Sequence, residues 1–128
     1  EGNDVKPGEV MCIDPDRPGQ LRRSTQAYDS TVAGIVSGAG GVNPGLTLTQ
    51  EATMAQGRHP VALTGRVYCW VDADSGGAVQ PGDLLTTSPV PGHAMKANRA
   101  KASGATLGKA MTRLNSGRGL VLVLVPLQ

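Results

Sequence analysis

Short apolar segments separated by turn residues run along the chain, and most of them alternate in the way that is typical of β-strands. Helix is predicted only for one or two turns at Gln50 to Gln56 and at Ala97 to Ala102, while the glycine-rich residues 38–41 and 74–77 are predicted to be loops. The predicted strands are residues 9–14, 20–24, 31–37, 45–49, 60–73, 83–88, 93–97, 105–112 and 119–126. The pattern therefore predicts an all-β fold, a small barrel or sandwich with one or two short helical turns.

Two of the predicted strands are apolar on both faces. Residues 120–125 have a large aliphatic side chain at every position, and residues 66–73 form a second strongly apolar strand. Such strands need cover on both faces, and the predicted helices are too short to supply it. Contact between copies of the chain is the remaining cover, so we expect a homo-oligomer. The residues predicted for this interface are Leu120, Leu122, Val123, Leu124, Val125 and Trp70.

The chain contains an internal repeat. Residues 5–11 resemble residues 79–85 at an offset of 74, and Gly34 corresponds to Gly108 at the same offset. Two units are too few for a solenoid, which favours a closed barrel or a paired sheet. The sequence predicts a single domain over residues 1–128, with repeat units at about 5–38 and 79–117 and a linking strand segment at about 45–73.

Each unit opens with a turn made of proline, glycine and an acidic residue. Proline presets φ for the first central position of the turn, and glycine supplies a positive φ at the next. The carboxylate that follows can accept backbone N–H groups at the turn. We therefore assign a structural role, rather than a catalytic one, to Pro7, Gly8, Glu9, Pro81, Gly82 and Asp83.

Composition narrows the classes further. The 128 residues are 39% hydrophobic with a net charge of +2, which fits one globular domain rather than a disordered chain. Basic residues are scattered and only three aromatic residues are present, so no nucleic-acid partner is expected. No apolar run has the length of a membrane span and the first residues do not resemble a signal peptide, so no membrane insertion is expected. Because the chain begins without Met, we interpret it as a piece of a longer polypeptide.

Catalytic and metal-binding signatures are weak. Cys12 and Cys69 lie in apolar runs without partners at metal-site spacing, which favours two buried free thiols over a disulfide, and neither a metal nor another cofactor is expected. His59 and His93 flank turns and are expected to be solvated. The carboxylate pairs at residues 14–16 and 72–74 lack the rest of a calcium loop, so they are interpreted as solvated loops.

The turn and strand motifs resemble a known type of module. The segments Pro81 to Ser88, Pro91 to Lys96, Gly117 to Val123 and Tyr28 to Gly38 look like the β-rich C-terminal module of bacterial and phage fibre-like or surface proteins, mostly of unassigned function. The Gly-Asp turns also resemble those of duplicated small β-barrels of the cradle-loop group. The resemblance to fibre-like and surface proteins implies an extracellular or virion-associated, non-catalytic assembly or capping module, with a homotrimer favoured.

Two other functions stay open at this stage. A self-cleaving or hydrolytic domain would use Ser88, Thr86 or Thr87 near His93, although no Gly-x-Ser-x-Gly elbow is present. A carbohydrate-binding module would stack aromatic rings on sugar faces, and it would have to use the three aromatic residues of the chain, which are Tyr28, Tyr68 and Trp70.

Overall fold

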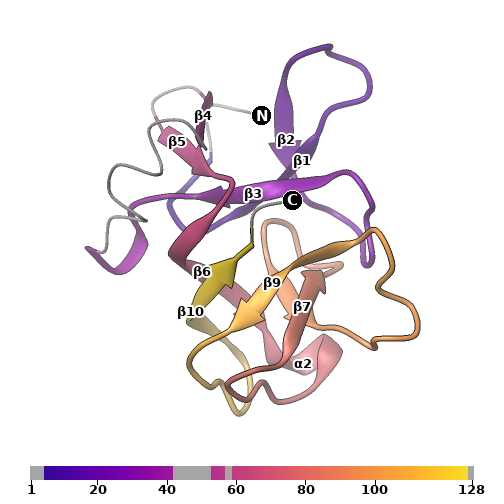
Figure 1. Ribbon diagram of the computed structural model, residues 1–128, viewed down its shortest axis with the longest axis vertical. Helices are drawn as coiled ribbons and strands as arrows, with labels where there is room; N and C mark the ends of the chain where they lie inside the picture. Colours follow the sequence, from indigo (N-terminus) through magenta and orange to yellow (C-terminus); the bar gives the residue numbers. More distant parts are fainter. Residues whose placement is uncertain (1–4, 42–52, 57–58, 127–128) are drawn as a thin grey trace.

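The computed structural model describes residues 5–41, 53–56 and 59–126, and within them the fold is all-β, as predicted (Figure 1). The strands are β1 (Val10–Ile13), β2 (Leu21–Arg23), β3 (Val32–Val36), β4 (Thr53–Gln56), β5 (His59–Ala62), β6 (Gly65–Asp72), β7 (Leu84–Thr87), β8 (Ala94–Lys96), β9 (Thr106–Ala110) and β10 (Arg118–Val125). Two short helices accompany them, η2 (Ala39–Gly41) and α2 (Ala73–Gly76). Neither helix is long or apolar enough to cross a membrane.

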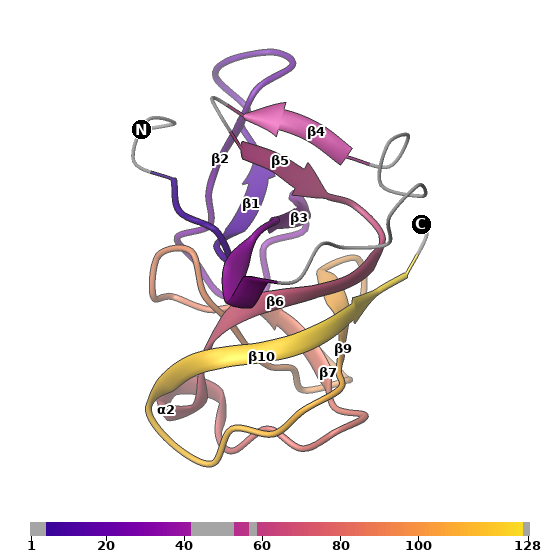
Figure 2. The ribbon, with the colours of Figure 1, turned by 90° about the vertical axis from the view of Figure 1, so that its left-hand side faces the viewer.

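The strands form two sheets that lie one above the other (Figures 1 and 2). The first sheet is open and has the order β2-β1-β3-β5-β4, whereas the second closes into a barrel with the order β10-β6-β8-β7-β9. The barrel closes through the parallel pair of β6 and β8, where Val71 is opposite Ala94. The chain passes from β5 of the first sheet directly into β6 of the barrel, so the two sheets share a junction.

Corresponding strands of the two sheets pair in the same register. Met11 of β1 is opposite Gly34 of β3, and Leu85 of β7 is opposite Gly108 of β9, which is the offset of 74 seen in the sequence. Both ladders shift register immediately after Met11 and Leu85. The two strand pairs therefore share their register and the position of its shift, in agreement with the repeat in the sequence. That the two whole units superpose stays a prediction. Of the segment expected to link them, β4 and β5 belong to the first sheet and β6 to the barrel.

The two Pro-Gly-acidic turns also have the same internal hydrogen bonds. The glycine of each turn has a positive φ, 91° in the first and 94° in the second. The N–H of Lys6 donates to Glu9 Oε1 at 2.9 Å, and the N–H of Gln80 donates to Asp83 Oδ2 at 2.8 Å. The carboxylates therefore satisfy backbone donors at the turns, as predicted from the sequence.

The barrel interior contains the main core. Alternate residues of β6 and β10 point into it, because successive side chains of a strand point to opposite faces. They are Val67, Cys69 and Val71 of β6 and Val121, Val123 and Val125 of β10, and all six are buried. A smaller cluster in the first sheet contains Val5, Met11, Leu21, Val36 and Val61.

Several local predictions were wrong. Both segments predicted to be helical differ: Thr53–Gln56 is strand β4, and residues 97–102 form turns in which the N–H of Ala100 donates to Asn98 Oδ1. That bond offers the backbone an alternative to helix. Short helices instead occur in the two predicted loops, at η2 and α2. The predicted strand 60–73 is two strands, β5 and β6, and residues 45–49 and 50–52 lie outside the described residues.

Candidate functional site

Outward-pointing side chains of β10 form an apolar strip on the barrel, which we call the outer stripe. Leu120 is opposite Trp70 of β6, and Leu122 is opposite Tyr68. These four side chains are half-buried, whereas Leu124 is 45% exposed. Figure 2 shows β10 crossing the front of the molecule, with no other described segment in front of it.

Met111 extends the outer stripe toward β9. Its N–H donates to the carbonyl of Leu122 at 2.7 Å, and its side chain is 40% exposed. Only one other large apolar side chain of the described residues is as exposed as Met111 and Leu124, namely Ile13 on β1 of the first sheet. Two of the three exposed side chains, Met111 and Leu124, therefore belong to the barrel.

The structure divides the predicted interface residues into two groups. Val123 and Val125 are core residues of the barrel, with exposed fractions of 0% and 3%, so they are not available for contact between subunits. Trp70 lies on β6 beside the outer stripe, but its backbone N–H donates to the carbonyl of Gly8 at 2.8 Å, and a Cβ placed on Gly8 would lie 2.9 Å from Trp70 Cδ1. Leu120, Leu122 and Leu124 are thus the accessible part of the prediction.

The hydroxyl groups considered for catalysis are all fully buried and already bonded. Ser88 Oγ donates to Asp72 Oδ2 at 2.9 Å, and Thr87 Oγ1 accepts the backbone N–H of Asp29 at 2.8 Å. Thr86 Oγ1 donates to a backbone carbonyl. Each hydroxyl is therefore already hydrogen-bonded, Ser88 to a carboxylate and Thr86 and Thr87 to backbone groups.

His93 does not have the solvated position expected for it. Its ring is half-buried, its centroid lies 5.9 Å from that of Trp70, and its Nδ1 is 2.9 Å from the carbonyl oxygen of Pro91. Within the described residues, no hydrogen bond joins this ring to any of the three hydroxyls. The side chain of His59 lies outside the described residues.

Asp72 also differs from its prediction as a solvated loop residue, because it is only 1% exposed. Its carboxylate caps α2 by accepting the N–H groups of Asp74 and Ser75 at 3.0 and 3.1 Å, in addition to the Ser88 hydroxyl. Burial raises the pKa of Asp72, but hydrogen bonds from Ser75, Ser88 and Asp74 outweigh it and hold the pKa below its ordinary value. This network joins the end of β6, the start of α2 and the end of β7.

The other side chains considered as metal ligands are hydrogen-bonded within a turn or buried. Asp14 Oδ1 accepts the N–H of Asp16 at 2.9 Å, which closes a turn. Cys12 and Cys69 are buried free thiols, as predicted, and burial raises the pKa of Cys12 to about 12 with a further contribution from Asp29. Burial also raises the pKa of Cys69. Nowhere in residues 5–41, 53–56 and 59–126 do three metal-binding side chains gather.

A cavity of about 240 Å³ opens where the first sheet meets the barrel, and we call it the junction pocket. It is lined by Ser30, Val32, Ala33, Leu63, Gly104, Thr106, Leu107 and Val125. These residues come from β3 and the residues before it, the β5–β6 turn, the β8–β9 loop with β9, and the end of β10. Sequence reasoning missed the pocket because no single segment carries its pattern.

Comparison with known proteins adds no relative to this picture, since no protein family model and no curated protein matches the chain.

Proposed function

We propose that the chain is a non-catalytic assembly module of a larger fibre-like or surface protein, and that it forms a homotrimer through the outer stripe. The single observation that carries this proposal is the double-sided apolar strand β10. The barrel covers its inner face. On its outer face Leu124 is 45% exposed between Arg66 of β6 and Lys109 of β9, and Met111, which bonds to Leu122, is 40% exposed. The choice of a trimer over a dimer rests on the resemblance to fibre-like proteins.

The energy available from the outer stripe is moderate. Full burial of a Leu or Met side chain contributes about 1.5–3 kcal/mol, so covering the exposed half of Leu124 and Met111 contributes about 1 kcal/mol each. A closed ring with three-fold symmetry lets one stripe contact both of its neighbours, which uses the same side chains in two contacts. Because ordering costs oppose association, we expect an assembly that depends on protein concentration.

The test compares two substitutions of exposed apolar strand residues. Leu124→Asp places a charge in the outer stripe, while Ile13→Asp makes the same change at a side chain that is 53% exposed on the first sheet. Sedimentation velocity and light scattering at high micromolar concentration are expected to give a trimer for the wild type and Ile13→Asp and a monomer for Leu124→Asp. Circular dichroism checks that all three proteins keep the same strand content.

Two results would overturn the proposal. One is a wild-type chain that stays monomeric at high micromolar concentration. The other is a trimer that survives Leu124→Asp, or that dissociates equally in Ile13→Asp, since either outcome places the subunit contact away from the outer stripe.

A further inference from the structure

Charge is distributed unevenly between the two sheets. Before residue 63, the described residues contain four basic and four acidic side chains. From residue 63 to residue 126 the chain contains seven basic side chains and three acidic ones, and no acidic residue follows Asp83. The barrel therefore carries the excess positive charge.

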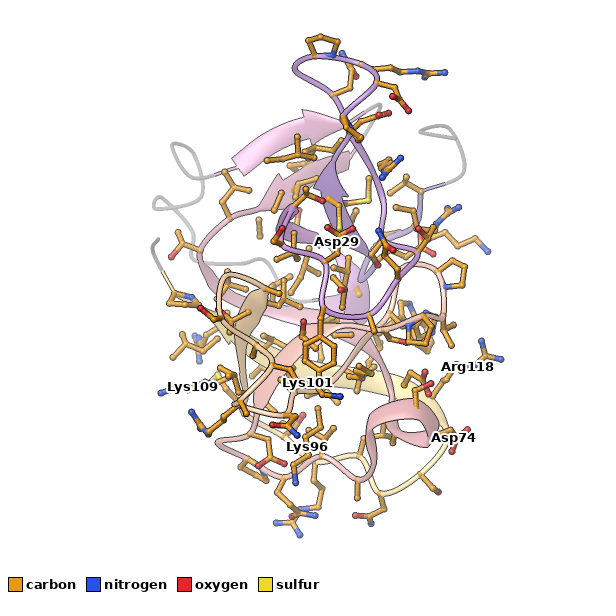
Figure 3. All side chains as sticks on the ribbon, turned by 90° about the vertical axis from the view of Figure 1, so that its right-hand side faces the viewer. Asp29, Asp74, Lys96, Lys101, Lys109 and Arg118 are labelled. Carbon is orange, nitrogen blue, oxygen red and sulfur yellow. The ribbon has the colours of Figure 1, made fainter. Side chains whose placement is uncertain are left out.

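Two of the three acidic residues of the barrel have local partners. Asp72 is buried at the start of α2 with its hydrogen-bond donors, and Asp83 Oδ2 lies 3.7 Å from Lys96 Nζ. Asp74 is exposed, and Figure 3 shows it on the side of Arg118, apart from the lysines. On the lysine side of the barrel Asp83 offsets Lys96, while Arg99, Lys101 and Lys109 add further positive charge.

Four exposed basic residues lie along this side, and we call them the basic face. They are Lys96 at the end of β8, Arg99 and Lys101 in the β8–β9 loop, and Lys109 in β9. Figure 3 shows the three lysines on the same side of the molecule. Lys96 and Lys109 flank β7, because β7 pairs with β8 on one side and with β9 on the other.

The basic face leads to the junction pocket. The β8–β9 loop continues from Lys101 to Gly104 and Thr106, which line the pocket together with Ser30. Its volume of about 240 Å³ lies below the range of about 300–1,000 Å³ that is typical of drug-sized ligands. It therefore suits a single ring or substituent of a longer molecule that follows the basic face.

We propose that the basic face binds an anionic polysaccharide and that the junction pocket holds one of its sugar residues. Exposed positions of the β8–β9 loop are basic, polar or small, so amide and hydroxyl groups such as Asn98 and Ser103 can bond to a hydroxyl-rich polymer. The loop itself has no aromatic ring and no large apolar side chain to enter a lipid surface. One ring lies beside it, because the N–H of Asn98 donates to the Tyr28 hydroxyl at 2.8 Å, and a single ring can pack on a sugar but forms no platform for successive bases. This proposal does not require the trimer, although Lys109 is opposite Leu124 of the outer stripe.

The test measures binding of the full chain to labelled heparin and to polygalacturonate by fluorescence anisotropy at several salt concentrations. Lys101→Glu/Lys109→Glu removes two attractive contacts and adds two repulsive ones, so affinity at low salt is expected to fall at least about tenfold. Arg17→Glu/Arg118→Glu gives the same change in net charge at two exposed residues away from the basic face, since Figure 3 shows Arg118 apart from the lysines, and it is expected to cost less than about threefold. Ser30→Leu narrows the pocket and is expected to weaken binding without changing its salt dependence.

The outcomes separate the possible ligands. Equal losses in the two double variants would show that only net charge matters and would overturn the basic face as a site. Unchanged affinity in Ser30→Leu would overturn the role of the junction pocket. Tighter binding to a DNA duplex, or to vesicles containing phosphatidylglycerol, than to either polysaccharide would overturn the ligand class.

Discussion

Gly108 is the position at which the smallest substitution is expected to cause a large loss of stability. A Cβ at Gly108 would lie 2.3 Å from the carbonyl oxygen of Leu124 and 3.1 Å from Val123 Cγ1. Ordinary contact begins at 3.4 Å, so β9 and β10 would have to separate by about 1 Å. β10 cannot move away freely, because its other edge pairs with β6 along its whole length.

The cost of Gly108→Ala follows from these contacts. Overpacking of a closely packed site costs about 1–3 kcal/mol, and each weakened backbone hydrogen bond between β9 and β10 adds about 1 kcal/mol. We expect the free energy of unfolding to fall by about 3–5 kcal/mol, which is a large part of the 5–15 kcal/mol typical of a small domain. Gly34→Ala is expected to behave similarly, since its Cβ would lie 2.2 Å from the carbonyl oxygen of Ala62.

Urea denaturation followed by the fluorescence of the single tryptophan, Trp70, measures this loss. The matched control is Gly119→Ala in β10, where the nearest neighbour is the end of the Leu114 side chain at 3.1 Å, which can rotate away. The control is expected to stay within about 1 kcal/mol of the wild type. A Gly108→Ala protein that loses less than the control would refute the reasoning from the close approach.

Two further predictions concern buried titratable groups. Because hydrogen bonds hold the pKa of Asp72 below its ordinary value of 3.8, its carboxylate stabilises the fold above that value and the contribution is lost as pH falls through the lowered pKa. Asp72→Ala is therefore expected to lower the free energy of unfolding by about 2–4 kcal/mol at pH 7 and to flatten its decline below about pH 4, and equal acid sensitivity in both proteins would count against this assignment. Since burial raises the pKa of Cys12 to about 12, neither thiol is expected to react with a maleimide at pH 7 until denaturant is added, and rapid labelling of the native chain would contradict the buried positions.

Strands and turns were predictable because their causes are local. Alternation of apolar residues located β1, β2, β3, β7, β8, β9 and β10 within two residues of their ends, and the Pro-Gly-acidic turns were identified with their hydrogen bonds. The match of Gly34 with Gly108 was visible in the sequence, but its cause was not. That cause is a carbonyl oxygen on a neighbouring strand, which only the assembled sheet supplies.

The remaining features depend on partners that are distant in the sequence. Asp72 looked like a solvated carboxylate, and it is buried because the hydroxyl of Ser88 and the first turn of α2 surround it. The strand at residues 120–125 was seen to be apolar on both faces, yet which face the barrel covers depends on the register with β6. The basic face was likewise hidden, since its lysines come from two strands and a loop that meet only in the barrel.

The pairing of β6 with β10 has a consequence for folding during translation. Three strands and their loops separate the two partners in the chain, although they are neighbours along their whole length in the barrel. During synthesis β6 leaves the ribosome first and stays without this partner until Arg118–Val125 has emerged. An apolar strand with a free edge pairs readily with the wrong chain. The barrel therefore cannot close until β10 has been translated, and the interval before β10 emerges is when the nascent chain most needs a chaperone.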